Sequence, residues 1–331
     1  PKRVAEPLSC SCSLVDRADL RTWSPSSCDA EGNMPSSVFT HRAHHRDHPW
    51  EGFDGTAREH LPHARDLLRG ALAEFLAMTL FVFFGCGAAA GNAHFEDNDW
   101  DPASVMVISL QFGLAITVLA FATAHTSGGH INAAVTFGLT LVGKCHPARA
   151  AVYVVAQLAG SITGAAILQG ATSGGLDRSG SLGANGLAPN VSLGNAFAFE
   201  CMATFFLIYI VLETAVNPHS VTTNGESSIL GNKQNLAPFS IGFAVFVAHV
   251  ACIPVTGCSI NPTRSFGPAV ISGQWEDHWL WWVGPLAGSL GASLVWWVMK
   301  RLDDKSDVER RKSTCGGEDS DRRQGQSQAS S

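Results

Sequence analysis

The sequence predicts an all-α membrane protein with six transmembrane helices and two re-entrant half-helices in an inverted repeat. Of its 331 residues 46% are hydrophobic and only 15% are charged, and the apolar residues concentrate between about residues 70 and 300. That region contains six mostly uncharged stretches, each long enough to cross a hydrocarbon core of ~30 Å as a helix. Its two halves also resemble each other, and each holds a short helical segment that is too short to span.

The six apolar stretches fix the domain organisation. They lie near residues 70–90, 103–124, 147–170, 195–216, 236–256 and 278–300. We expect a membrane domain over 70–300, with repeats at about 70–170 and 195–300. The polar segments 1–69 and 301–331 are expected to be disordered tails, because they have too few apolar residues to form a core.

The positive charges predict the orientation. Of the 22 Lys and Arg residues, all but Arg178 and Arg264 lie in the two tails or in loops that carry Lys144, Arg149 and Lys233. Cytoplasmic loops of membrane proteins are enriched in these residues, so both tails are expected to be cytoplasmic. The sequence leaves open whether the protein resides in the plasma membrane or in an internal membrane.

Composition also excludes several classes of function. A chain with six apolar spans is not a soluble enzyme, and a net charge of −6 without a basic stripe gives no sign of nucleic-acid binding. The nine cysteines show neither a CxxC pair nor zinc-ligand spacing. We therefore expect no enzymatic activity, no metal and no cofactor, and the partners that remain are membrane lipid and a small solute.

An internal repeat relates the two halves of the membrane domain. The first span reads LAEFLAMTLFVFF and contains Glu74, and the fourth reads FAFECMATFFLIYIV and contains Glu200. A short segment follows the second span of each half, SGGHINAAVTFG from Ser127 and TGCSINPTRSFG from Thr256. Three spans separate the copies, so the second is inverted relative to the first. Such repeats place a shared site at the bilayer midplane. Gly160 with Gly164, and Gly284 with Gly288, are expected at close helix contacts.

Each short segment predicts a half-helix that starts at the midplane. Asn132 and Asn261 are favourable N-cap residues, and Pro262 suits the first helical position of the second segment. Their N-termini would meet and place about +0.5 charge each at one point. That arrangement repels cations and suits a neutral solute.

The backbone before each N-cap is expected to be extended and to leave carbonyl groups unpaired. Lipid does not tolerate unpaired carbonyls unless they line a wet cavity, so a water-filled pore follows. The residues concerned are Gly128, Gly129 and His130 in the first copy and Gly257, Cys258 and Ser259 in the second.

With these motifs the chain over about 70–300 resembles the aquaporin (major intrinsic protein) family. The resemblance rests on the paired Asn-centred loops, the two Glu residues and the string SINPTRSFGPAV. The family pattern is Asn-Pro-Ala in both loops, and each loop departs by one residue, at Ala133 and at Thr263. The resemblance implies a passive, single-file water channel that excludes ions and protons and assembles as a homotetramer.

The resemblance also implies roles for individual residues. Asn132 and Asn261 would direct amide N–H groups at the permeating molecule. A second constriction, toward the outer side, would be formed by Phe112, His249, Cys258 and Arg264, a set that resembles the water-selective type. Glu74 and Glu200 would hold the two loops by hydrogen bonds rather than carry protons.

Three alternatives remain open at this point. The same architecture could conduct another small neutral solute, such as hydrogen peroxide, ammonia or glycerol, a reading favoured only by Ala133 and Thr263. A secondary transporter would need a coupling-ion site, and an adhesion protein would not need the constriction residues. Ala133 and Thr263 leave both asparagines, both helix dipoles and Arg264 in place, so the sequence predicts that these two residues affect water permeability little.

Overall fold

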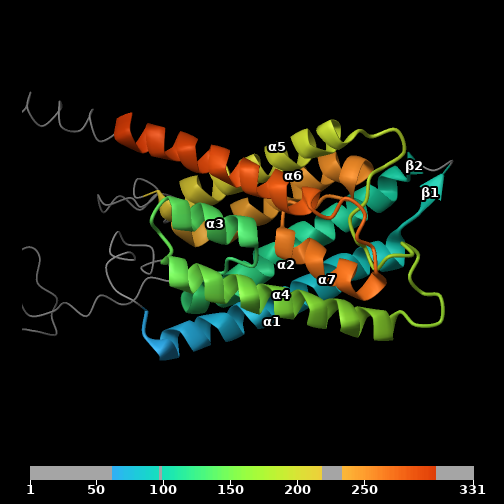
Figure 1. Ribbon diagram of the computed structural model, residues 1–331, viewed down its shortest axis with the longest axis horizontal. Coiled ribbons are helices and arrows are strands. Elements are labelled where there is room, and N and C mark those ends of the chain that lie inside the picture. The colour runs from blue at the N-terminus through green and yellow to red at the C-terminus, as the bar shows by residue number, and fades with distance from the viewer. Residues whose placement is uncertain (1–61, 97–98, 218–232, 303–331) are drawn as a thin grey trace, which may run out of the picture. The chain divides into compact units, whose positions relative to one another are not determined.

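The computed structural model describes residues 62–96, 99–217 and 233–302, and they form a bundle of helices (Figure 1). Six of the helices are long and apolar enough to cross a membrane, which confirms the predicted fold class. Most of the two predicted tails lies outside the described residues.

The long helices follow the predicted order. They are α1 (Ala64–Asn92), α2 (Pro102–Ser127), α4 (Pro147–Ala171), α5 (Leu193–Val211), α6 (Ala237–Thr256) and a last helix, Leu280–Leu302. The two short helices are α3 (Ala133–Leu141) and α7 (Pro262–Ser272). Figure 1 shows the start of α1 and the end of the last helix at the same end of the bundle. An even number of crossings requires this arrangement.

Several elements differ from the expected boundaries. The first helix begins at Ala64, so residues 64–69, expected in the N-terminal tail, are helical. Hydropathy misses this turn because it carries charges, which are tolerated where a helix leaves the hydrocarbon. A π-helical turn, η6 (Leu212–Val216), extends α5, and a 3₁₀ turn, η8 (Lys233–Leu236), precedes α6. A two-residue antiparallel ladder, β1 (Phe95–Glu96) with β2 (Asp99–Trp100), joins α1 to α2.

The start of α2 is fixed by an N-cap. Asp101 Oδ2 accepts a hydrogen bond of 2.8 Å from the backbone N–H of Ser104, and Pro102 follows at the first helical position. This bond to the charged carboxylate lowers the pKa of Asp101. The Ser104 hydroxyl donates to the Asn92 carbonyl at 2.7 Å, which ties the end of α1 to the start of α2.

Glycines allow the same close approach in both halves of the bundle. A methyl group at Gly160 on α4 would overlap the carbonyl oxygen of Phe75 on α1. At Gly288 on the last helix it would overlap the carbonyl oxygen of Cys201 on α5. Gly164 and Gly284 likewise face α1 and α5, so the predicted close helix contacts are confirmed.

Candidate functional site

The N-termini of α3 and α7 meet inside the bundle and are joined by crossed hydrogen bonds. Asn132 caps α3: its Oδ1 accepts from the N–H of Ala134 at 2.7 Å, and its Nδ2 donates to the carbonyl of Ile260 at 2.9 Å. Asn261 caps α7 in the same way. Its Oδ1 accepts from the N–H of Arg264 at 3.1 Å, and its Nδ2 donates to the Ile131 carbonyl at 2.8 Å. An amide nitrogen carries two hydrogens, so each asparagine keeps one N–H for the lumen.

The backbone before each N-cap is not extended, contrary to the expectation from sequence. In the first loop φ is positive at Gly128 (90°), Gly129 (61°) and Ile131 (49°). In the second loop it is positive at Gly257 (69°), at Cys258 (56°) and at Ile260 (44°). Left-handed conformations are costly for non-glycine residues, so long-range contacts must hold them.

Two buried glutamates supply those contacts. Glu74 Oε1 accepts from the N–H of His130 at 2.9 Å, and its Oε2 accepts from the N–H of Ile131 at 2.7 Å. Glu200 accepts from the N–H groups of Ser259 and Ile260, each at 2.8 Å. The carbonyls of Ile131 and Ile260, whose N–H groups the carboxylates accept, in turn accept from Asn261 and Asn132.

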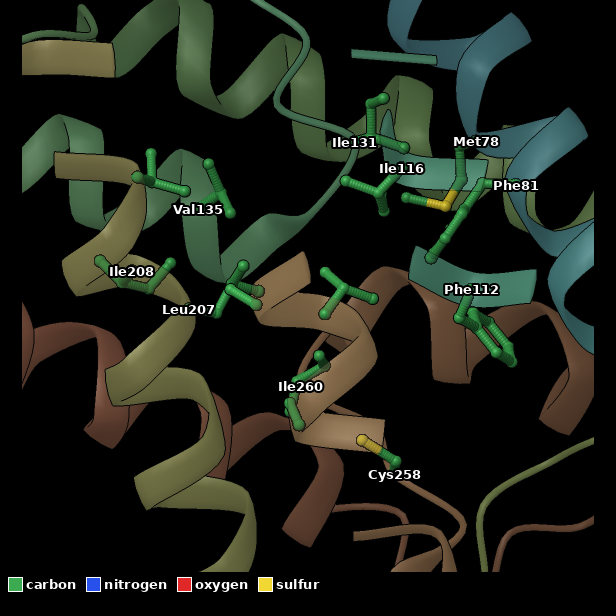
Figure 2. Close-up of a cluster of buried hydrophobic side chains, with 14 of the residues drawn as sticks. Met78, Phe81, Phe112, Ile116, Ile131, Val135, Leu207, Ile208, Cys258 and Ile260 are labelled. Atoms are coloured by element: carbon green, nitrogen blue, oxygen red, sulfur yellow. The ribbon is translucent and has the colours of Figure 1, made fainter. Parts of the chain in front are cut away.

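A narrow cavity of about 40 Å³ passes both loops, with room for about three water molecules. Gly128, Gly129 and His130 of the first loop line it, together with both capping asparagines. Of the second loop only Ser259 and Ile260 precede Asn261 in the lining; Gly257 lines a separate, second cavity, and Cys258 lines neither space. Apart from His249 and Arg264 the rest of the wall is apolar, and Figure 2 shows Phe81 (α1), Ile116 (α2), Val135 (α3) and Leu207 (α5) among these side chains.

Three of the four predicted constriction residues lie close together: His249 and Arg264 line the cavity, and Phe112, which lines neither space, is fully buried behind them. The rings of Phe112 and His249 stack at 4.4 Å between centroids, and the Arg264 guanidinium lies 4.9 Å from the Phe112 ring centre. Arg264 lines both this cavity and the second cavity of about 210 Å³, so it stands between the two spaces. The fourth residue, Cys258, is fully buried in the hydrophobic core (Figure 2).

Two nitrogens at this constriction lack hydrogen-bond partners among the described residues: Nε2 of His249 and Nε of Arg264. The other ring nitrogen of His249, Nδ1, lies 2.8 Å from the Val245 carbonyl and must donate to it. The neutral imidazole therefore presents Nε2 as an acceptor, while Arg264 presents a donor. Both residues line the cavity, so water in it can supply the missing partners, a donor for Nε2 and an acceptor for Nε.

Sequence reasoning missed the residue that holds Arg264 in place. Asn185, in the loop between α4 and α5, is 3% exposed. Its Oδ1 accepts from Arg264 Nη1 at 2.8 Å and from Ser265 Oγ at 2.7 Å. The Gly183 carbonyl accepts a second bond from the same Nη1 at 2.9 Å. A lone Asn in a Gly-rich loop carries no signal that would identify it from sequence.

Comparisons with known proteins agree with this geometry. The family model described as "Major intrinsic protein" matches residues 63–296. An "Aquaporin PIP-type" of Atriplex canescens is 42% identical over 228 residues, which cover 68% of this chain and 78% of that protein. "Aquaporin-1" of Sus scrofa is 42% identical over 231 residues, 69% of this chain and 80% of that protein. Among solved structures, the aquaglyceroporin from Plasmodium falciparum has a TM-score of 0.56 at 26% identity and covers 70% of this chain and 93% of that one.

Proposed function

Since the chain belongs to the major intrinsic protein family, we propose that it is a passive transmembrane water channel that excludes ions and protons. The relatives named as aquaporins support this function, and the observation that carries it is the narrow cavity with two unpaired nitrogens at its constriction. His249 offers an acceptor and Arg264 a donor, and water can donate to the first and accept from the second. The Phe112 ring stacks on His249 and lies 4.9 Å from the Arg264 guanidinium, so it holds both groups in place, and we expect the narrow cavity to exclude a larger polyol.

Exclusion of ions and protons follows from the same elements. At an effective dielectric constant of ~20, a half-charge at a helix N-terminus repels a monovalent cation 5 Å away by roughly 2 kcal/mol, and the lumen has two such ends and Arg264. A water molecule that accepts from both Asn132 and Asn261 directs its hydrogens outward. The hydrogen-bonded chain of water then reverses at that point, and protons cannot hop along it.

A coupled transporter is the less favoured mechanism, because each loop glutamate already accepts from its own loop backbone. We assign Glu74 and Glu200 to holding the loops rather than to carrying a coupling ion. The proposed channel has no catalytic activity, forms a homotetramer with one pore per protomer, and has both termini in the cytoplasm.

Stopped-flow light scattering of proteoliposomes tests the water-channel function. Vesicles with the protein should shrink in hyperosmotic sorbitol much faster than protein-free vesicles. In glycerol they should shrink as fast and then re-swell no faster than the protein-free control. Shrinkage at the protein-free rate would overturn the proposal, and rapid glycerol re-swelling would show the alternative of a wider solute range.

A further inference from the structure

The two half-helices differ at the residues that follow their N-caps. The first begins Asn132-Ala133-Ala134 and the second begins Asn261-Pro262-Thr263. Proline has no N–H, so Pro262 needs no partner at the first helical position. Ala133 has an N–H there, and the first N–H groups of a helix have no acceptor within it. The N–H of Ala133 is buried, so its acceptor must come from outside α3.

Thr263 of the opposite half-helix supplies that acceptor. The backbone nitrogen of Ala133 lies 3.3 Å from Thr263 Oγ1, and the same hydroxyl donates to Asn261 Oδ1 at 2.7 Å. The hydroxyl therefore accepts from one half-helix and donates to the N-cap of the other. Thr263 is completely buried, so bulk water does not compete for these bonds.

The contact also fixes the amide of Asn261. Its Oδ1 accepts from both the Thr263 hydroxyl and the N–H of Arg264, which occupies both lone pairs of the oxygen. The amide nitrogen must then face the Ile131 carbonyl and the lumen. Oε1 of the buried Gln157 lies 3.4 Å from the hydroxyl, too far to compete with the 2.7 Å bond for its single hydrogen.

We propose that Ala133 and Thr263 form a matched pair. The Thr263 hydroxyl positions the Asn261 amide that faces the pore, and it leaves space at position 133 only for a residue with a backbone N–H. The assignment of the Asn261 amide to the pore rests on the proposed water-channel function. The pairing itself rests on the contacts alone.

The backbone at position 133 suits proline, but the Thr263 hydroxyl does not. Asn132 has φ −164° and ψ 126°, close to the extended conformation that residues before proline adopt, as Asn261 does before Pro262. A proline ring carbon would lie along the present N–H direction about 1.5 Å from the nitrogen, and so only about 2 Å from Thr263 Oγ1. Normal contacts between such atoms exceed ~3 Å. Thr263 therefore excludes proline at position 133.

From these contacts we expect that changing either residue alone impairs the protein. The sequence alone predicts instead that Ala133 and Thr263 affect water permeability little. Ala133→Pro alone creates a clash with the hydroxyl. Thr263→Ala alone leaves the buried N–H of Ala133 without an acceptor and Asn261 Oδ1 with one donor fewer. The double variant removes the N–H and the hydroxyl together, so it should be tolerated although each single change is not.

A double-mutant cycle tests the pair through two readouts. We would purify the wild type, both single variants and the double variant, and measure thermal midpoints in detergent and water permeability per reconstituted channel. Each single variant should lose about fivefold in permeability, the size of coupling expected between residues in contact, and should melt at a lower temperature. The double variant should regain the wild-type values of both.

Conservative and matched variants separate positioning from general damage. Thr263→Ser keeps the hydroxyl and should retain permeability, whereas Thr263→Val keeps the shape and should lose it. Thr204→Val is the control, because Thr204 is equally buried and its hydroxyl has no hydrogen-bond partner among the described residues. It should behave as the wild type.

The outcomes distinguish this inference from the water-channel function. Single variants that match the wild type in both readouts, or a double variant worse than either single, would overturn the pair. A wild type that conducts no water would overturn the proposed function and the pore role of Asn261, while the thermal midpoints would still decide the pairing. Loss of permeability in Thr263→Ser would overturn the role of the hydroxyl.

Discussion

Asn261 is held more firmly than Asn132, although both cap half-helices in equivalent places. Asn261 makes three hydrogen bonds through its side chain amide to Arg264, Thr263 and Ile131. Asn132 makes two, to Ala134 and Ile260. The lumen therefore contains one amide with a fully determined orientation and one with more freedom. A water molecule between them meets a fixed donor on the side of α7.

The width of the constriction gives a prediction at the scale of single residues. Replacing Phe112 and His249 by alanine should admit glycerol while water flow persists, because His249 lines the cavity and the Phe112 ring stacked on it holds it there. Glycerol permeability of proteoliposomes measures the effect. Phe112 is fully buried, so its truncation should also destabilise the fold by about 3–5 kcal/mol.

The control for this variant is Phe243→Ala on α6, whose side chain is 64% exposed. It removes an aromatic ring without approaching the cavity and should leave glycerol excluded. A folded double variant at Phe112 and His249 that still excludes glycerol would contradict the assignment of the constriction.

At the scale of elements, each loop depends on one carboxylate that reaches it from another helix. Glu74 on α1 holds the loop before α3, and Glu200 on α5 holds the loop before α7. The left-handed residues Ile131 and Ile260 are the ones whose N–H groups these carboxylates accept. A buried charge thus stabilises a backbone conformation that the residues would not adopt by themselves.

Glu74→Gln and Glu200→Gln should therefore each destabilise the protein. A glutamine amide keeps one acceptor oxygen, and in either orientation its NH₂ group faces a backbone N–H of the loop. Leaving such a donor unpaired costs about 1–3 kcal/mol, which should appear as a lower thermal midpoint. Glu213→Gln, near the end of α5 and only partly buried, is the control. Equal midpoints for all three variants would refute the role of the carboxylates.

Helix α4 packs closely on α1 at Gly160. Gly160→Ala should destabilise the protein, because the new methyl group would overlap the Phe75 carbonyl oxygen. Gly170→Ala is the matched control on the same helix, since no atom lies within 4 Å of a methyl group there. Gly170→Ala should be neutral or stabilising by up to about 1 kcal/mol. Thermal unfolding in detergent compares the two variants. Equal shifts of the thermal midpoint would contradict the role of Gly160 in the packing of α4 on α1.

The sequence predicts the six spans and both half-helices because hydropathy and N-cap preferences act over short distances. It does not predict the left-handed conformations of Ile131, Cys258 and Ile260, since partners far away in the chain impose them. The same reason hides Asn185, which becomes important only where a loop meets Arg264. The link between Ala133 and Thr263 joins residues 130 positions apart, and each looks like an independent departure when read alone.

At the scale of the whole molecule, the helices present large apolar side chains on their outer surfaces. Val118, Val155, Met202 and Phe243 are all more than 60% exposed, each from a different long helix. Lipid or neighbouring protomers must cover these surfaces in a membrane protein.

The association state is tested by native mass spectrometry of the purified protein. We expect a complex with the mass of four 35.1-kDa chains. A monomer that is stable in several mild detergents would contradict the proposed homotetramer, while its water permeability after reconstitution would show whether one chain holds a complete pore.

Orientation is tested by epitope tags at the two ends of the chain. Both tags should bind antibody only after the membrane is permeabilised, because the positive charges favour cytoplasmic tails. A tag inserted after Gly174, in the exposed loop between α4 and α5, should bind without permeabilisation. Labelling of only one terminus on intact cells would contradict the even number of crossings.

The crossed bonds between the two asparagines have a consequence for the order of events during synthesis. Asn132 leaves the ribosome well before its partner carbonyl at Ile260, which lies 128 residues later. At about 5–20 residues per second this interval lasts roughly 6–26 s. During that time the first loop waits in the membrane with its asparagine unpaired by the second. The first half of the chain therefore cannot complete its pore lining until the second half has been made at least as far as Ile260.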